Sequence, residues 1–246
     1  MLFLLTATRS PLARAQDAPP SVKALIPIVG SVRGANEIQW RTDVELVNNT
    51  GAEATVAISL PTVPDQPMIL LTIAPSSTQR FTDVVGEAFG LEAAMSPLLV
   101  QTAGRRSVGV RAFAYGIRGG EVFRPEPIAI TYGDAFYPAR YLQGLSFSDN
   151  FRTNIGLANL GDQPAQFALA LQRLPGRNLT ISRVTIPPNT LWHQSVQMLF
   201  PLITSGDDFS VLVETFAHDT YVYASVVDNV TNEARFVSAS IGAAAQ

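Results

Sequence analysis

The side chains that could act as bases or metal ligands are few in this chain. Among its 246 residues are two histidines, His193 and His218, and no cysteine. Neither histidine lies in a His-Glu-x-x-His or His-x-Glu pattern, so a metal site built on histidines is not expected. His193 follows Trp192 in an expected strand, and His218 precedes Asp219 at an expected turn. We interpret both histidines as residues of the surface or of a strand edge.

A serine nucleophile is not predicted either. Residues 144–148, Gly-Leu-Ser-Phe-Ser, begin like the nucleophile elbow of serine hydrolases but lack its final glycine and its strand-turn-helix context. His193 and Ser195 are close in sequence, but a catalytic pair needs a third, orienting acid. Alternate positions on a strand, or a helix cap, account for the two residues better.

The carboxylates are scattered rather than paired. A glycosidase uses two acids about 5–10 Å apart, whereas most aspartates here stand at expected strand ends and turns, where they cap or form the turn. These are Asp43, Asp83, Asp149, Asp207, Asp208 and Asp228. Asp207 and Asp208 could bind calcium, but a calcium loop normally supplies several spaced carboxylates. No glycine-rich phosphate loop is present, so we expect no catalytic residues, no metal and no cofactor.

The overall charge excludes some partners. The chain has 17 basic and 20 acidic residues, a net charge of −3, and no basic excess that could neutralise a nucleic acid backbone. Arg105 and Arg106 form the one basic doublet in the folded part and are expected at a solvated loop tip. The apolar fraction of 47% and the charged fraction of 15% indicate a folded chain rather than a disordered one.

The N-terminus resembles a secretion signal. Residues 2–7 are mostly apolar, and Ala13-Arg14-Ala15 fits the small-x-small pattern of signal peptidase cleavage. The apolar run is short and no basic residue precedes it, as expected if the natural start lies upstream. We therefore expect residues 1–15 to be a signal peptide, residues 16–23 a linker, and the protein to be exported to the periplasm or outside the cell. No later segment has the roughly 20 apolar residues of a membrane-spanning helix.

The two halves of the remaining chain resemble each other. Trp40 and Arg41 correspond to Phe151 and Arg152 at an offset of 111 residues, and the same offset relates Asn48 to Asn159. From residue 72 the offset becomes 113, which relates the segments 72–75 and 185–188 and, further along, Phe123 and Phe236. The pattern predicts the duplication of a unit of about 110 residues, too long for a solenoid repeat.

Within each half, short alternating runs separated by turn residues predict strands. Hairpins are expected at Asn48–Gly51 and Asn159–Asp162, where Asn and Gly accept the backbone angles of tight turns. One short helix per half is expected after Thr82 or Ser195 as N-cap. Because 17 prolines and 17 glycines interrupt the chain, long helices are excluded. The fold class predicted is all-β, with a two-sheet sandwich at residues 24–134 and a second at 135–246.

The pattern at residues 41–48, Arg-Thr-Asp-hydrophobic-x-Leu-x-Asn, resembles the tandem immunoglobulin-like repeats of secreted bacterial proteins. The likeness covers residues 24–240, and it implies a fold and export rather than an activity. We interpret the recurring Trp40, Arg41, Phe151 and Arg152 as structural. Each guanidinium is expected to satisfy carbonyls or a turn carboxylate while its aliphatic stem covers the adjacent aromatic ring.

The function expected is that of a non-catalytic, exported module that binds a protein, a glycan or an envelope component. Recognition by sandwiches usually lies in their end loops, so the weak candidates are residues in the loops that differ most between the halves. These are Arg105, Arg106, Arg173, Arg177, His218 and Asp219. A secreted hydrolase with carboxylate or serine chemistry and a self-assembling or spacer subunit remain alternatives. The partner and the oligomeric state stay open.

Overall fold

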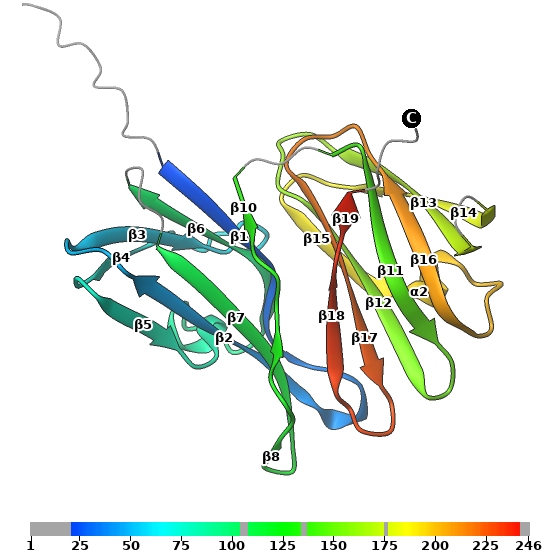
Figure 1. Cartoon of the computed structure of the whole chain (residues 1–246), viewed down its shortest axis with the longest axis horizontal. Coiled ribbons are helices and arrows are strands. Elements are labelled where there is room, and N and C mark those ends of the chain that lie inside the picture. Colours follow the sequence, from blue (N-terminus) through cyan, green and yellow to red (C-terminus); the bar gives the residue numbers. More distant parts are fainter. Residues whose placement is uncertain (1–20, 104–107, 134–136, 175–176, 242–246) are drawn as a thin grey trace, which may run out of the picture.

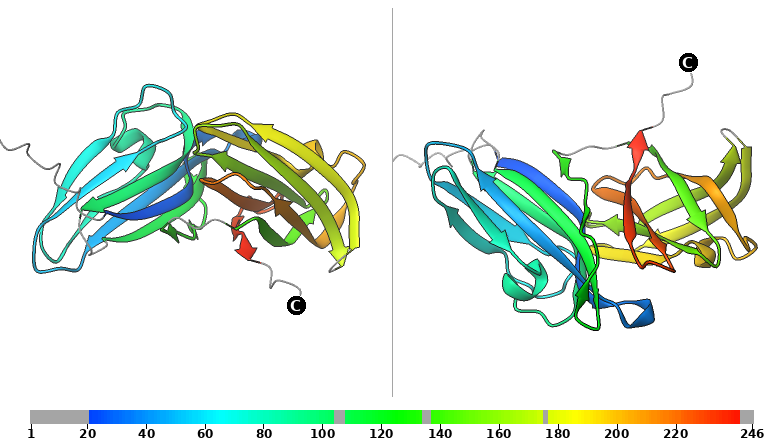
Figure 2. Two further views of the ribbon diagram at one scale, coloured as in Figure 1. Left: turned by 90° about the horizontal axis from the view of Figure 1, so that it is seen from above. Right: turned by 60° about the horizontal axis from the view of Figure 1, so that its bottom comes forward.

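The computed structural model describes residues 21–103, 108–133, 137–174 and 177–241. The expected signal peptide at 1–15, most of the expected linker, and Arg105 and Arg106 lie outside the described residues. The chain is all-β, as predicted: antiparallel strands make up the sheets, and the helices are short. The strands form two groups that lie side by side (Figures 1 and 2).

The first group comprises ten strands. They are β1 (Ser21–Arg33), β2 (Gln39–Asn48), β3 (Ala54–Ser59), β4 (Ile69–Ile73), β5 (Ser77–Phe81), β6 (Ala94–Ala103), β7 (Gly109–Arg118), β8 (Glu121–Val122), β9 (Glu126–Pro127) and β10 (Thr131–Tyr132). A 3-10 turn η1 (Ala35–Glu37) follows β1, and the helix α1 (Val84–Glu87) follows β5.

The second group comprises nine strands and one short helix. They are β11 (Ala139–Phe147), β12 (Phe151–Asn159), β13 (Ala165–Leu174), β14 (Arg177–Ile186), β15 (Thr190–Ser195), α2 (Val196–Leu199), β16 (Gly206–Glu214), β17 (Thr220–Asp228), β18 (Ala234–Ser238) and β19 (Ser240–Ile241).

The strand order is the same in both groups. In the second group, one sheet has the order β14-β13-β16-β11-β19 and the other β15-β12-β17-β18. In the first group the corresponding layers are β4-β3-β6-β1-β10 and β5-β2-β7-β8. They join into one ten-stranded sheet because the end of β1 pairs with the start of β2, at Val32 with Trp40 and Arg33 with Gln39. This agreement supports the duplication hypothesis, which stays a prediction.

Each group has a core of its own between its two layers. The side chains of β2 alternate between buried and half-buried from Thr42 to Asn48, as the two-residue period of a strand requires. Of the buried ones, Val44 and Leu46 join an apolar cluster with residues of β1, β3, β6 and β7 in the first group. An equivalent cluster in the second group contains residues of β11, β12, β13, β16 and β17. The core of each half is therefore built from that half alone, apart from Phe236, which packs at the edge of the first cluster.

Asn48 and Asn159 make the same set of hydrogen bonds in the two halves. Nδ2 of Asn159 donates to the carbonyls of Gln163, Ile186 and Pro187 at 2.8–3.1 Å, and its Oδ1 accepts from the backbone N–H of Gly161. Asn48 is bonded in the same way to Ala52, Ile73, Ala74 and Thr50. Both side chains are buried, so each asparagine fastens a hairpin turn to a neighbouring strand end.

Three details differ from the sequence-based expectations. β1 begins at Ser21 rather than at residue 24, so the expected linker overlaps the first strand. The N-cap of α1 is Asp83 and not Thr82, because the Asp83 side chain accepts from the N–H of Gly86; the cap of α2 is Ser195, as predicted. Phe236 does not take the place of Phe123: it lies opposite Ser225 in β17, whereas the N–H of Phe123 bonds to Gly116.

The predicted division between residues 134 and 135 lies outside the described residues, between the end of β10 at Tyr132 and the start of β11 at Ala139. The division into two domains stays a prediction. The halves touch through a separate apolar cluster in which Leu25 of the first half packs with Ala158 and Tyr221 of the second. Polar contacts add to it: Lys23 Nζ lies 3.7 Å from Asp219 Oδ1.

Replacing Asn159 with Ala should lower the free energy of unfolding by about 2–4 kcal/mol, because buried carbonyls lose their donor. Urea denaturation of the full chain measures this. Asn48→Ala should cost a similar amount, and Gln166→Ala, at an exposed position of β13, should cost little. A cost for Asn159→Ala no larger than that for Gln166→Ala would contradict the role assigned to the asparagine.

Candidate functional site

A cleft of about 450 Å³ lies between the two halves. Its lining residues come mainly from β1, β2, β6, β7 and β9 of the first half and from β12, β15, β17 and β18 of the second. The volume falls within the range of roughly 300–1,000 Å³ that small-molecule sites occupy. Since both halves supply walls, the cleft exists only when they are packed together.

The wall from the first half is largely apolar. It consists mainly of Ile28, Val32, Trp40, Met95, Ala114 and Ile128. Trp40 owes its position to Gly34, because a Cβ at residue 34 would lie 2.5 Å from the indole Nε1. The glycine therefore lets the indole lie directly against the backbone just after the end of β1.

The wall from the second half carries polar side chains beside the apolar Val227, Ala234 and Phe236. The two-residue period of β12 turns Ile155 and Leu157 into the core, whereas Arg152 and Asn154 line the cleft. Antiparallel register then sets Ser225 of β17 opposite Asn154. Donors and acceptors from neighbouring strands thus form one continuous surface.

Gly156 allows two aromatic side chains to meet across β12. The register places Gly156 between Tyr223 on one side and His193 on the other. A Cβ at residue 156 would lie 2.1 Å from the Tyr223 ring, so that ring lies flat over the glycine. Its hydroxyl then reaches His193 Nδ1, with which it shares a hydrogen bond of 2.9 Å. On its other side Tyr223 stacks with Phe236 at 5.5 Å between ring centroids.

Burial keeps this pair uncharged near neutral pH. It lowers the pKa of His193 to about 4, and it raises the pKa of the fully buried Tyr223 well above its ordinary value. His193 is therefore a neutral imidazole and Tyr223 a neutral phenol at pH 7. In this state the pair adds no charge to the cleft lining.

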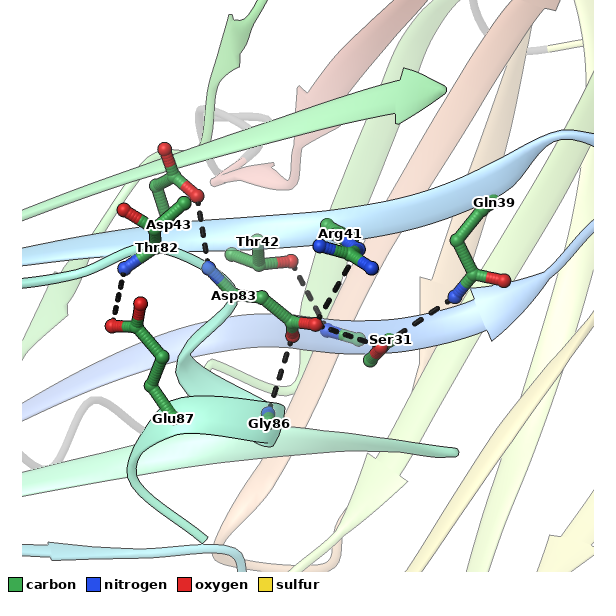
Figure 3. A network of polar contacts seen from close by, with 10 residues as sticks. Ser31, Gln39, Arg41, Thr42, Asp43, Thr82, Asp83, Gly86 and Glu87 are labelled. Atoms are coloured by element: carbon green, nitrogen blue, oxygen red, sulfur yellow. Dashed lines mark hydrogen bonds and ion pairs between the residues drawn. The ribbon is translucent and has the colours of Figure 1, made fainter. Parts of the chain in front are cut away.

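Arg41, on the wall of the first half, belongs to a network of polar contacts (Figure 3). Its Nε lies 3.5 Å from Asp83 Oδ2, which also accepts a hydrogen bond from the hydroxyl of Ser31. Asp43 accepts from the backbone N–H of Asp83 at 3.0 Å. Burial and a hydrogen bond to Asp43 raise the pKa of Tyr115 to about 12. The positive charge of Arg41 is thus matched by carboxylates, in line with the expected pairing with a turn carboxylate.

Arg152 has a different environment. Its Nη1 donates to Asn229 Oδ1 at 2.5 Å. Asn229 is a neutral amide in the turn between β17 and β18. Ser195 and Val196 stand at the start of α2, at the place that Asp83 takes at the start of α1 in the first half. Asn154 stands at the position that corresponds to Asp43. The second half therefore keeps the arginine without the two aspartates. Burial lowers the pKa of Arg152.

The structure brings together some of the residues singled out in the sequence. Trp40, Arg41 and Arg152 line the cleft, whereas Phe151 packs at the edge of the second core. Whether their role is structural, as expected from the sequence, stays a prediction.

The loop candidates lie elsewhere. Arg173 is exposed and donates to the carbonyl of Ser205, and Asp219 pairs with Lys23. His218 and Asp219 do not line the cleft. Arg177 belongs to β14, and its side chain, like Arg105 and Arg106, is outside the described part. The loops therefore do not form the site described above, and their role in recognition stays a prediction.

Sequence reasoning missed the pair formed by His193 and Tyr223. The available signal was Gly156, because an isolated glycine in an apolar strand often marks a close approach of another group. That signal indicates a contact at the glycine without identifying which residues make it.

Among the described residues, no group of three or more histidines or carboxylates could hold a metal ion. Asp207 and Asp208 stand near the start of β16. Within the same residues, no helix combines the length and apolar character needed to cross a membrane.

No protein-family model, no curated protein and no solved structure matches this chain. The resemblance to immunoglobulin-like repeats of secreted proteins therefore stays a prediction.

Gly156→Ala should lower the free energy of unfolding by about 1–3 kcal/mol, because the added methyl group displaces the Tyr223 ring. Gly51→Ala is the matched control, since nothing lies within 4 Å of a Cβ built there. Chemical denaturation of both variants measures the difference. Equal stability of the two variants would show that the ring does not lie over Gly156.

The stability of the protein should fall as the pH is lowered from 6.5 to about 4. In this window the unfolded state binds a proton at His193 whereas the folded state, with its lowered pKa, does not. His193→Gln removes this contribution, so its unfolding free energy should depend less on pH over the same range. Titration of the imidazole by NMR gives the pKa directly, and His218→Gln assigns the second signal. An ordinary pKa near 6.5 for His193 would contradict its burial.

Proposed function

We propose that this protein is a non-catalytic, exported binding module that holds a small ligand in the cleft between its two halves. The observation that carries the proposal is the cleft itself, whose lining combines apolar side chains from both halves with polar groups such as Asn154, His193 and Ser225. Sites of this kind bury a ligand body against apolar side chains and orient it with a few polar groups. A free small molecule, or one protruding group of a protein or glycan, suits the volume of about 450 Å³.

The lining chemistry supports binding over catalysis. Glu126 is the one carboxylate among the described lining residues, whereas a glycosidase needs two acids on opposite sides of the bond it cleaves. His193 shares its Nδ1 with Tyr223, and burial lowers its pKa to about 4, which makes it a weak base near neutral pH. These features favour the binding module over the secreted hydrolase.

The self-assembly alternative has one feature in its favour. β4 and β14 are edge strands, and each presents an exposed apolar side chain, Leu70 and Ile181. An unpaired strand edge can pair with another chain. Light scattering of the full chain separates this alternative, because a monomer at all concentrations tested excludes assembly through these edges.

The apolar fluorophore N-phenylnaphthylamine should bind the full chain at one saturable site, with an increase in fluorescence. Ala114→Trp and Ser225→Trp place an indole in the cleft from opposite walls, and each should abolish binding. Thr55→Trp, on an exposed position of β3, is the control and should bind like the unmodified protein. Absence of saturable binding, or binding that survives both cleft substitutions, would overturn the proposal.

A further inference from the structure

Arg152 is a half-buried cation that has no counter-ion among the described residues. A guanidinium has five N–H donors, and within the same part of the chain Arg152 makes one side-chain hydrogen bond, to Oδ1 of Asn229. The ion pairs within the described part of the chain involve other cations: Lys23, Arg33, Arg41, Arg80 and Arg111. Holding a cation away from water beside neutral groups costs free energy, so a ligand that supplies the anion would be stabilised there.

The first half shows how such an arginine is neutralised inside the fold. Arg41 has Asp83 at 3.5 Å, and Asp43 holds the backbone of Asp83 in place. In the second half the corresponding positions carry no carboxylate, as described above. The cation is present in both halves, and its protein counter-ion is present in one.

The surroundings of Arg152 suit one end of an amphipathic molecule. Asn154 follows it on the same face of β12, and Ser225 lies opposite Asn154, so neutral hydrogen-bonding groups stand next to the guanidinium. Across the cleft, Ile28 and Val32 of β1 present apolar surface. A guanidinium pairs best with a planar, two-oxygen acceptor.

Three guanidinium groups line the cleft, those of Arg33, Arg41 and Arg152. Arg41 pairs with Asp83 and Arg33 with Glu37. Among the described residues, Arg152 is therefore the cation of the lining that has no ion pair and that an anion of the ligand would neutralise.

We propose that the cleft binds a small apolar molecule that carries a carboxylate, and that Arg152 pairs with this carboxylate. The inference rests on the proposed function and names the ligand class of the same cleft.

Decanoate and decanol test the inference, because they share an apolar chain and differ in the charged group. Each is titrated against the full chain loaded with N-phenylnaphthylamine, and displacement of the fluorophore gives the affinity. Decanoate should bind more tightly than decanol. Arg152→Gln should weaken decanoate about tenfold, which corresponds to the loss of about 1.4 kcal/mol, and leave decanol unchanged.

Three further substitutions extend the test. Arg173→Gln makes the same change of charge outside the cleft and should leave both affinities unchanged. Glu126→Gln removes the negative charge from the lining and should tighten decanoate binding. Thermal melts of all variants report whether they fold. If Arg152→Gln does not fold, Arg152→Lys replaces it in the test, because lysine keeps the charge without the planar fork of the guanidinium. Arg152→Lys should weaken decanoate binding by less than tenfold.

The outcomes separate the two proposals. If the fluorophore does not bind, the proposed function fails. If the fluorophore binds in the cleft but decanoate binds no better than decanol, only the carboxylate inference fails. If Arg152→Gln lowers the melting temperature and weakens both compounds equally, Arg152 is structural and the inference is overturned.

Discussion

The apolar contact between the two halves is the interaction on which the cleft depends. Leu25 of β1 is buried against Ala158 of β12 and Tyr221 of β17, and burying one such leucine contributes about 2 kcal/mol. Further along the same strands, Ile28, Gly30, Val32 and Arg33 of β1 and Arg152 of β12 line the cleft. Arg152 lies six positions before Ala158, which is about 20 Å along the strand. The halves touch again where Asn36 Nδ2 donates to Asn232 Oδ1 at 3.4 Å and where Phe236 packs against the first core.

The polar wall of the cleft is held by groups that satisfy one another. A buried tyrosine hydroxyl needs a hydrogen-bond partner, and Tyr223 finds it in His193 because Gly156 leaves the path between them free. Stacking on Phe236 supports the ring from the other side. This part of the wall is therefore shaped before any ligand arrives, which reduces the ordering that a ligand must impose.

The two halves share a strand order and differ in how they treat charge. The buried asparagines that fasten the hairpins, Asn48 and Asn159, make matching bonds, because the turn geometry in each half demands a donor for the same carbonyls. No such turn geometry fixes the hydrogen-bond partners of the arginines. Arg41 is paired with Asp83, whereas Arg152 faces the cleft beside the neutral Asn229. The arginine at this position therefore has a carboxylate partner in one half and, among the described residues, a neutral amide partner in the other.

The sequence by itself determined the strands, the hairpin turns and the all-β class, because the alternation of β2 and the turn residues after Asn48 act over a few neighbouring residues. It indicated that Arg41 and Arg152 correspond, but not that both would line one cleft. It also missed His193 and Tyr223, which lie 30 residues apart and meet only through the register of β12. The tertiary structure decided which outer sheet faces meet and what lines the space between them. Such contacts join residues from opposite halves, so they depend on the fit of two surfaces and leave no periodic trace in either segment.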